Sequence, residues 1–181
     1  KKRKRDDQEK PVSAKRRFDL RRLFTNARKK SGSPLHLEIC SGSGEWLSSQ
    51  ALRDPTSNWM ACELRFDRAA RCFQRFALRG LTDAGNVGLI AGDAQNALEN
   101  HLKKGCCAKI FINHPEPPHQ TDLDRAVEVD SGASGTEATH LLTRGFLQNA
   151  CAPVLQDEGV LTICTDNLPY GEWLLNAFAS E

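Results

Sequence analysis

Short apolar segments alternate with amphipathic segments over most of this chain. Five apolar segments have the length and composition of buried strands, at residues 35–40, 58–62, 87–90, 108–113 and 159–165. Helical patterns follow them, at residues 45–53, 66–79, 94–103, 139–150 and 172–180. This alternation predicts the α/β class, with a mostly parallel sheet of about five strands and helices on both faces. Ligands of such sheets bind beyond the carboxyl ends of the strands.

Length and composition narrow the class of protein further. A chain of 181 residues suits one domain with a hydrophobic core. No apolar run is long enough for a transmembrane helix and no hydrophobic signal segment is present, so we expect an intracellular protein, nuclear or cytoplasmic, without a membrane partner. The cysteines lack CxxC spacing, which favours reduced, buried thiols. There are seven of them: Cys40, Cys62, Cys72, Cys106, Cys107, Cys151 and Cys164.

Charge is divided unevenly along the chain. Residues 1–30 carry a balance of +10 and the remaining residues a balance of −8. We therefore predict a flexible basic tail at 1–15, a domain at 16–181 that begins with a short basic helix at 15–30, and a mobile loop near 120–138. The run KKRKR at 1–5 fits a nuclear-import signal, a phosphate-binding arm or a solubilising end equally well.

The predicted helix at 66–79 has two contrasting faces. An apolar arc is expected to pack on the sheet, and it contains Phe66, Ala69, Ala70, Phe73, Phe76 and Ala77. The opposite arc is an arginine ridge, formed by Arg65, Arg68, Arg71, Arg75 and Arg79. Such a ridge suits binding of phosphates, and an ordinary solvated helix face explains it equally well.

The first strand runs into a glycine turn that suits a cofactor. PLHLEICSGSGEW (34–46) places Glu38 in the strand and Gly42 and Gly44 in the turn before a helix. The spacing fails the GxGxxG dinucleotide pattern, since Leu47 stands at the third glycine position. An acidic strand end would repel a pyrophosphate but suits an ammonium group, which S-adenosylmethionine carries.

Two further acids follow the next strands. Glu63 ends the second strand, where a carboxylate accepts hydrogen bonds from ribose hydroxyls. Asp93 follows the third, where it would accept from an adenine amine or simply cap the next helix. We expect Glu38, Glu63 and Asp93 to converge around one adenosyl group.

The fourth and fifth strands end in possible substrate groups. Prolines flank Glu116 and hold it stiffly, and Asp166 should lie on the same edge, unless it merely caps a helix. His114 and His119 have no further ligands at zinc spacing, so no metal site is expected.

These segments, in this order, resemble the tRNA (guanine-N7-)-methyltransferase family. The strings that carry the resemblance are PLHLEICSGSGEW, ACELR, GDA, INHPEPP, LLTRGFL and TDNLPY. The resemblance implies a Rossmann-like class I methyltransferase that uses S-adenosylmethionine to methylate N7 of a guanine in tRNA, in eukaryotes often with a WD-repeat propeller subunit.

The resemblance also implies roles for individual residues. Cofactor contacts are implied at Glu38, Gly42, Gly44, Glu63, Arg65, Asp93, Ala94 and Asn113. Catalytic roles are implied for Glu116, Thr165 and Asp166. We assign contacts with substrate RNA to Arg68, Arg71, Arg75, Arg79, Gln120 and Tyr170.

The chain also departs from the family pattern. Cys40 replaces a glycine, Glu116 an aspartate, Pro118 a tryptophan and Gln120 a lysine, and residues 122–137 are acidic rather than basic. The family's last two strands would lie beyond residue 181. The alternative is therefore a non-catalytic member that acts as an RNA- or partner-binding module.

Overall fold

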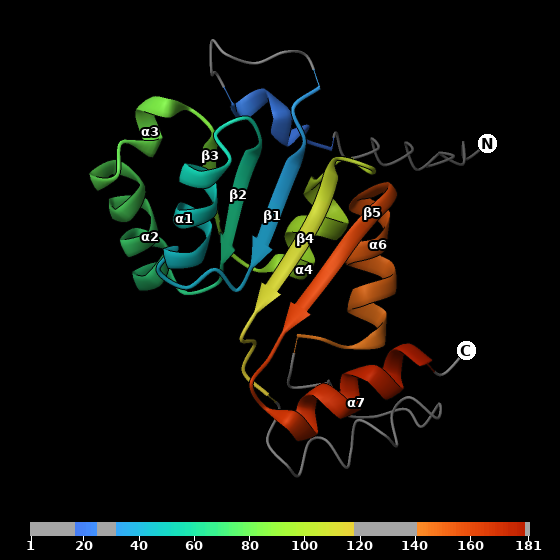
Figure 1. Ribbon diagram of the computed structural model, residues 1–181. Coiled ribbons are helices and arrows are strands. Elements are labelled where there is room, and N and C mark those ends of the chain that lie inside the picture. The colour runs from blue at the N-terminus through green and yellow to red at the C-terminus, as the bar shows by residue number, and fades with distance from the viewer. Residues whose placement is uncertain (1–16, 25–31, 118–140, 180–181) are drawn as a thin grey trace, which may run out of the picture.

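A five-stranded, entirely parallel sheet forms the centre of the computed structural model, which describes residues 17–24, 32–117 and 141–179. The strands lie in the order β3-β2-β1-β4-β5 (Figure 1). This is the order of Rossmann-type sheets, and it confirms the predicted α/β class. The strand bounds are β1 Leu35–Ile39, β2 Asn58–Glu63, β3 Val87–Ala91, β4 Cys107–Asn113 and β5 Leu155–Cys164.

Helices cover both faces of this sheet (Figure 1). On one face lie α1 (Glu45–Arg53), α2 (Phe66–Leu78) and α3 (Leu81–Ala84), whose core includes Leu47, Cys72 and Phe76. The larger core, on the other face, is closed by the remaining helical segments. These are η1 (Leu20–Leu23), α4 (Ala94–Asn96), η2 (Ala97–His101), η3 (Phe146–Cys151), α6 (Ala152–Val154) and α7 (Leu168–Ala179).

The central strands explain the apolar runs in the sequence. Every residue of β1 and β2 is buried, as expected for strands covered by helices on both faces. Polar side chains inside these strands, such as Glu38 and Glu63, are therefore buried as well. The fold itself carries these two carboxylates to the carboxyl edge of the sheet.

Several predicted boundaries were wrong. The helix expected at 139–150 is displaced, because helical structure continues through α6 and β5 already begins at Leu155. Helix α7 begins at Leu168 rather than 172. Pro169 is tolerated there because a proline in the first turn of a helix costs no backbone hydrogen bond. The Asn167 side chain also accepts a hydrogen bond from the Tyr170 N–H at 2.9 Å, which stabilises the start of the helix.

The packing of α2 differs from the prediction. Its buried residues are Ala69, Cys72 and Phe76, whereas Phe66 and Phe73 are 79% and 56% exposed. The helix meets the sheet along a narrower stripe than the apolar arc suggested, and this stripe includes the small thiol of Cys72.

Two more predictions need correction, and two others concern residues that the structure does not describe. All seven cysteines are free, but Cys40 and Cys164 are exposed rather than buried. The described part of the basic N-terminal helix is only the 3-10 turn η1. Within the described ranges, no helix has both the length and the apolarity needed to cross a bilayer. The tail at 1–15 and the loop near 120–138 fall outside those ranges.

Candidate active site

The carboxyl ends of β1 and β4 lie side by side at the point where the strand order reverses. Glu38, near the end of β1, is 2% exposed. Its Oε1 accepts a hydrogen bond from Asn113 Nδ2 of β4 at 3.0 Å, while Oε2 has no hydrogen-bond partner among the described residues. Burial raises the pKa of Glu38 to about 7, against the opposing effects of the Asn113 amide and the Leu47 backbone N–H. One oxygen of this buried carboxylate therefore lacks a well-formed hydrogen bond.

The turn after β1 requires glycine at two positions. Gly42 and Gly44 have φ values of 57° and 73°, in the left-handed region. A Cβ on Gly44 would lie 2.5 Å from Cys72 Sγ, so the turn packs tightly on α2. A Cβ on Gly42 would meet nothing within 4 Å, so the space over this residue is open. The turn is thus closed toward α2 and open at Gly42.

Glu63, at the end of β2, secures this turn. The Gly42 N–H donates to its Oε2 at 2.8 Å and the Arg65 N–H donates to its Oε1 at 2.9 Å. Each carboxylate oxygen has a second lone pair, so Glu63 can accept further hydrogen bonds. The Arg65 side chain itself is exposed and pairs with Asp67 at 3.1 Å.

Asp93 caps a helix, as one of the two sequence interpretations allowed. Its Oδ1 accepts from the Asn96 N–H at 2.6 Å at the start of α4, where Ala94 is buried. The preceding Gly92 has a φ of 157° and open space at its Cβ position. The cap holds Asp93 beside the third strand end, and the adenine contact stays a prediction.

Cys40 lies among the carboxylates of this edge. Its φ of 60° is unusual for a residue with a side chain. Desolvation raises the pKa of its thiol to about 11, with further contributions from the negative charges of Glu63, Glu116 and Glu38. These three acids, from the ends of β2, β4 and β1, therefore all lie within electrostatic range of the same thiol.

The ends of β4 and β5 form a second, more exposed group. Pro115 is buried and the adjacent Glu116 is exposed. His114 Nδ1 lies 3.6 Å from Asp166 Oδ1. The half-buried Thr165 accepts the Asn167 N–H on its Oγ1 at 3.2 Å. His114 was considered in the sequence only as a metal ligand, and no sequence signal indicated its pairing with Asp166.

Tyr170 lies away from solvent. It is 1% exposed, and its ring stacks on Trp173 with centroids 5.9 Å apart. Burial raises the pKa of its hydroxyl to about 12. This placement favours packing of α7 over the predicted contact with RNA.

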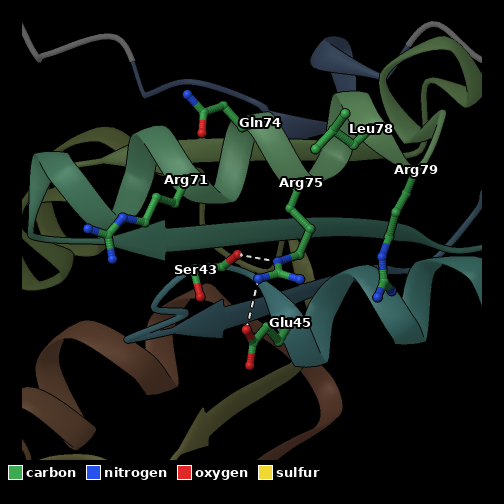
Figure 2. Close-up of a pocket in the computed structure, with 7 residues that line it drawn as sticks. All are labelled: Ser43, Glu45, Arg71, Gln74, Arg75, Leu78 and Arg79. Carbon is green, nitrogen blue, oxygen red and sulfur yellow. Dashed lines mark hydrogen bonds and ion pairs between the residues drawn. The ribbon is translucent and has the colours of Figure 1, made fainter.

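The arginine ridge borders a pocket of about 480 Å³ between α1 and α2 (Figure 2). The Arg75 guanidinium is already hydrogen-bonded to protein groups in this pocket. Its Nε donates to the Ser43 carbonyl at 2.9 Å and its Nη2 donates to Glu45 Oε1 at 2.8 Å. Arg79 Nη1 donates to Ser49 Oγ at 3.3 Å. Arg71 lines the same pocket and is exposed.

A protein-family model described as "Putative methyltransferase" matches residues 32–124, just over half of the chain. The chain belongs to this methyltransferase family. The match covers β1 to β4, with the glycine turn, Glu38, Glu63 and Glu116.

Curated relatives of this chain bear the family name that the sequence motifs indicated. The tRNA (guanine-N(7)-)-methyltransferase of Chlamydia caviae is 28% identical over 140 residues, which cover 77% of this chain and 55% of the relative. That of Chlamydia trachomatis is 34% identical over 95 residues, which cover 52% of this chain and 39% of the relative. These matches confirm the predicted resemblance, and the chain spans about half the length of the curated relatives it matches.

A solved structure is also similar to this chain. It is a SAM-dependent methyltransferase from Thiobacillus denitrificans in complex with S-adenosyl-L-homocysteine, 20% identical, with a TM-score of 0.45 over 73% of this chain and 42% of that one. Among the residues that the structure describes, no three His, Cys, Asp or Glu side chains form a metal-binding cluster.

The predicted site residues of this chain thus fall into three groups. The first lies at the ends of β1 to β4 and comprises Glu38, Gly42, Gly44, Glu63, Arg65, Asp93, Ala94 and Asn113. The second comprises Glu116, Thr165 and Asp166, beyond β4 and β5. The third is the arginine ridge on α2. Gln120 lies outside the described residues.

Proposed function

We propose that this protein transfers a methyl group from S-adenosylmethionine to N7 of a guanine in tRNA. The observation that carries the proposal is the buried Glu38 carboxylate at the reversal point of the sheet, whose Oε2 has no hydrogen-bond partner among the described residues. The relatives named tRNA (guanine-N(7)-)-methyltransferase support the choice of acceptor.

The residues present fit this cofactor. Glu38 Oε2 would accept from the ammonium group, and burial would make that charged contact strong. Gly42 and Gly92 leave open space where side chains would otherwise stand. Glu63 would accept from the ribose hydroxyls while it holds Gly42. When bound, S-adenosylmethionine supplies an electrophilic methyl group on a sulfonium.

The acceptor atom sets what the protein must do. Guanine N7 has a lone pair in the ring plane and no proton, so the protein needs no general base. Its residues contribute by aligning the base, which in favourable cases supplies about 7–11 kcal/mol of the barrier. They also stabilise the positive charge that develops on the purine.

Glu116 and Asp166 are the residues assigned to this stabilisation. As N7 becomes methylated, the guanine N1–H and amino hydrogens grow more acidic. A carboxylate that accepts from them binds the transition state more strongly than the ground state. Both side chains are exposed beyond neighbouring strands, so an incoming base can reach them. Thr165 keeps the turn before α7 in place through Asn167.

Contacts with the RNA backbone would come from the arginine ridge. Arg71 and the half-buried Arg68 remain candidates for phosphate contacts. Arg75 instead ties α2 to the glycine turn, which assigns it a structural part. The basic tail at 1–15 stays a predicted phosphate-binding arm, as KKRKR stays a predicted nuclear-import signal.

The test is a titration of the chain with S-adenosylmethionine followed by a methyl-transfer assay on bulk tRNA. The proposal expects both binding and transfer, with 7-methylguanosine as the product. Binding without transfer would support the alternative of an RNA- or partner-binding module. Transfer only to other acceptors would refute the guanine-N7 assignment. A WD-repeat subunit and an intracellular, nuclear or cytoplasmic location belong to the same proposal and are tested by co-purification and imaging.

A further inference from the structure

His114 and Asp166 form a histidine–carboxylate pair across the ends of β4 and β5. His114 Nδ1 lies 3.6 Å from Asp166 Oδ1, and the side chains are 64% and 89% exposed. The pair therefore faces the same open edge as Glu116. The proposed reaction gives Asp166 a part but leaves His114 without one.

The backbone holds His114 in an unusual conformation. Its φ is 47°, in the left-handed region that a residue with a side chain rarely adopts. The His114 N–H donates to the Cys164 carbonyl at 2.7 Å, which ties this residue to the end of β5. The following Pro115 is buried. Strained residues fixed in this way concentrate at functional sites.

The chemistry of the acceptor limits what the imidazole can do. Proton abstraction is excluded as its task because guanine N7 carries no proton. On that edge guanine presents two acceptors, N7 and O6, whereas adenine presents an amino donor in place of O6. N7 must face the methyl group, so O6 is the acceptor that still needs a donor.

The neighbouring acids cannot supply that donor. Ionised carboxylates such as Glu116 and Asp166 only accept hydrogen bonds, and the Asn113 amide already donates to Glu38. A protonated imidazole carries an N–H on both nitrogens. With Nδ1 directed at Asp166, its second nitrogen is available to a ligand.

We infer that His114, paired with Asp166, is a specificity-determining residue that donates a hydrogen bond to O6 of the acceptor guanine. This inference rests on the proposed function. The Asp166 carboxylate offsets the imidazolium charge, so the pair adds a donor without adding net positive charge beside a purine that becomes cationic. Adenine would present its own donor to this N–H and be rejected.

The test compares His114→Gly with the wild-type chain on a tRNA whose methylated guanosine has been mapped. Glycine adopts a φ of 47° without strain, so the backbone should be kept. At the mapped position the guanosine is replaced by inosine, which keeps O6, or by 2-aminopurine, which lacks O6. His101→Gln, an exposed site before the amino end of β4, is the control.

We expect the preference for guanosine over 2-aminopurine to fall about tenfold or more in His114→Gly, the effect of one hydrogen bond from a charged donor. The ratio of guanosine to inosine should not change, and neither ratio should change in His101→Gln. His114→Asn tolerates the left-handed backbone and keeps an amide donor, so it should give an intermediate preference.

An unchanged 2-aminopurine ratio in both His114 variants, with transfer to guanosine intact, would overturn this inference and leave the proposed function standing. A wild-type chain that binds S-adenosylmethionine but transfers nothing to the guanosine tRNA would overturn the proposed function, and this inference with it.

Discussion

The two halves of the candidate site are built differently. At the ends of β1 and β2, Glu38 and Glu63 are 2% and 5% exposed and bonded to protein amides. At the ends of β4 and β5, the side chains of Glu116 and Asp166 are exposed to solvent. The proposed cofactor half is therefore buried and hydrogen-bonded within the protein, whereas the proposed acceptor half is open to solvent. Substitutions in the first half should alter cofactor binding and stability, and those in the second should alter turnover.

The largest effect is expected from Glu38→Gln. The variant keeps the shape and the Asn113 contact but loses the buried negative charge. Affinity for S-adenosylmethionine should fall about 100-fold, the upper range for one charge-assisted hydrogen bond. Isothermal calorimetry measures it, with Glu99→Gln in η2 as the control. Equal affinities in wild type and Glu38→Gln would remove Glu38 from the cofactor site.

A second test sets two glycines of the same turn against each other. Gly44→Ala should lower the free energy of unfolding by about 2–4 kcal/mol, because a left-handed φ and a 2.5 Å contact with Cys72 act together. Gly42→Ala has only the φ penalty, about 1–2 kcal/mol, but its methyl group enters the open space. Urea unfolding and cofactor titration separate the two effects. Equal losses of stability would contradict the close packing of Gly44 on α2.

Glu116→Gln should distinguish most clearly between an effect on turnover and an effect on cofactor binding. Loss of the negative charge should lower turnover about tenfold, with cofactor affinity unchanged, because the carboxylate acts on the purine. Single-turnover methyl transfer and calorimetry give the two values. Equal losses in turnover and affinity would point to a structural role. Glu116→Asp should raise activity if the longer side chain is a handicap, and a fall would count against the family analogy.

The pH dependence of cofactor binding follows from the raised pKa of Glu38. Only the ionised form attracts an ammonium group, so affinity should rise about tenfold from pH 6 to pH 8, through about 7. The folded chain also holds the Glu38 proton more tightly than the unfolded chain does. This contribution to stability is therefore present at low pH and lost as pH rises from 4.5 through about 7. Glu38→Gln should flatten both profiles.

The smallest effect concerns the arginines of α2. Arg71→Gln should weaken tRNA binding about threefold and lower the salt slope by about one, the mark of one phosphate contact. Arg75→Gln should mainly lower thermal stability, because it breaks the bonds to Ser43 and Glu45. Fluorescence anisotropy at several salt concentrations measures the first. A larger salt effect for Arg75 than for Arg71 would reverse the assignment.

The sequence predicted the structure at the ends of β1 and β2 better than the structure at the ends of β4 and β5, for physical reasons. Strands that are buried on both faces appear in the sequence as continuous apolar segments, and a tight turn appears as closely spaced glycines. These two signals located β1, β2 and the turn at Gly42 and Gly44. The positive φ of His114 leaves no such pattern, because it depends on a hydrogen bond to Cys164 some fifty residues away in the chain.

The same limit explains the other errors. Helical spacing predicted the apolar face of α2 but overestimated the width of the stripe that meets the sheet, so Phe66 and Phe73 were misplaced. The partners of Arg75 come from a turn thirty residues earlier, and a pattern within one helix cannot indicate them. Tyr170 was assigned to an RNA contact from the string TDNLPY, and its burial was not predicted.

The two-pronged contact of Arg75 restricts how this molecule can evolve. One planar guanidinium holds both a main-chain oxygen and a carboxylate, which a lysine ammonium cannot match in geometry. A lysine at position 75 would keep the charge yet release the loop that carries Gly42 and Gly44. Relatives that change this arginine should therefore change the loop sequence along with it.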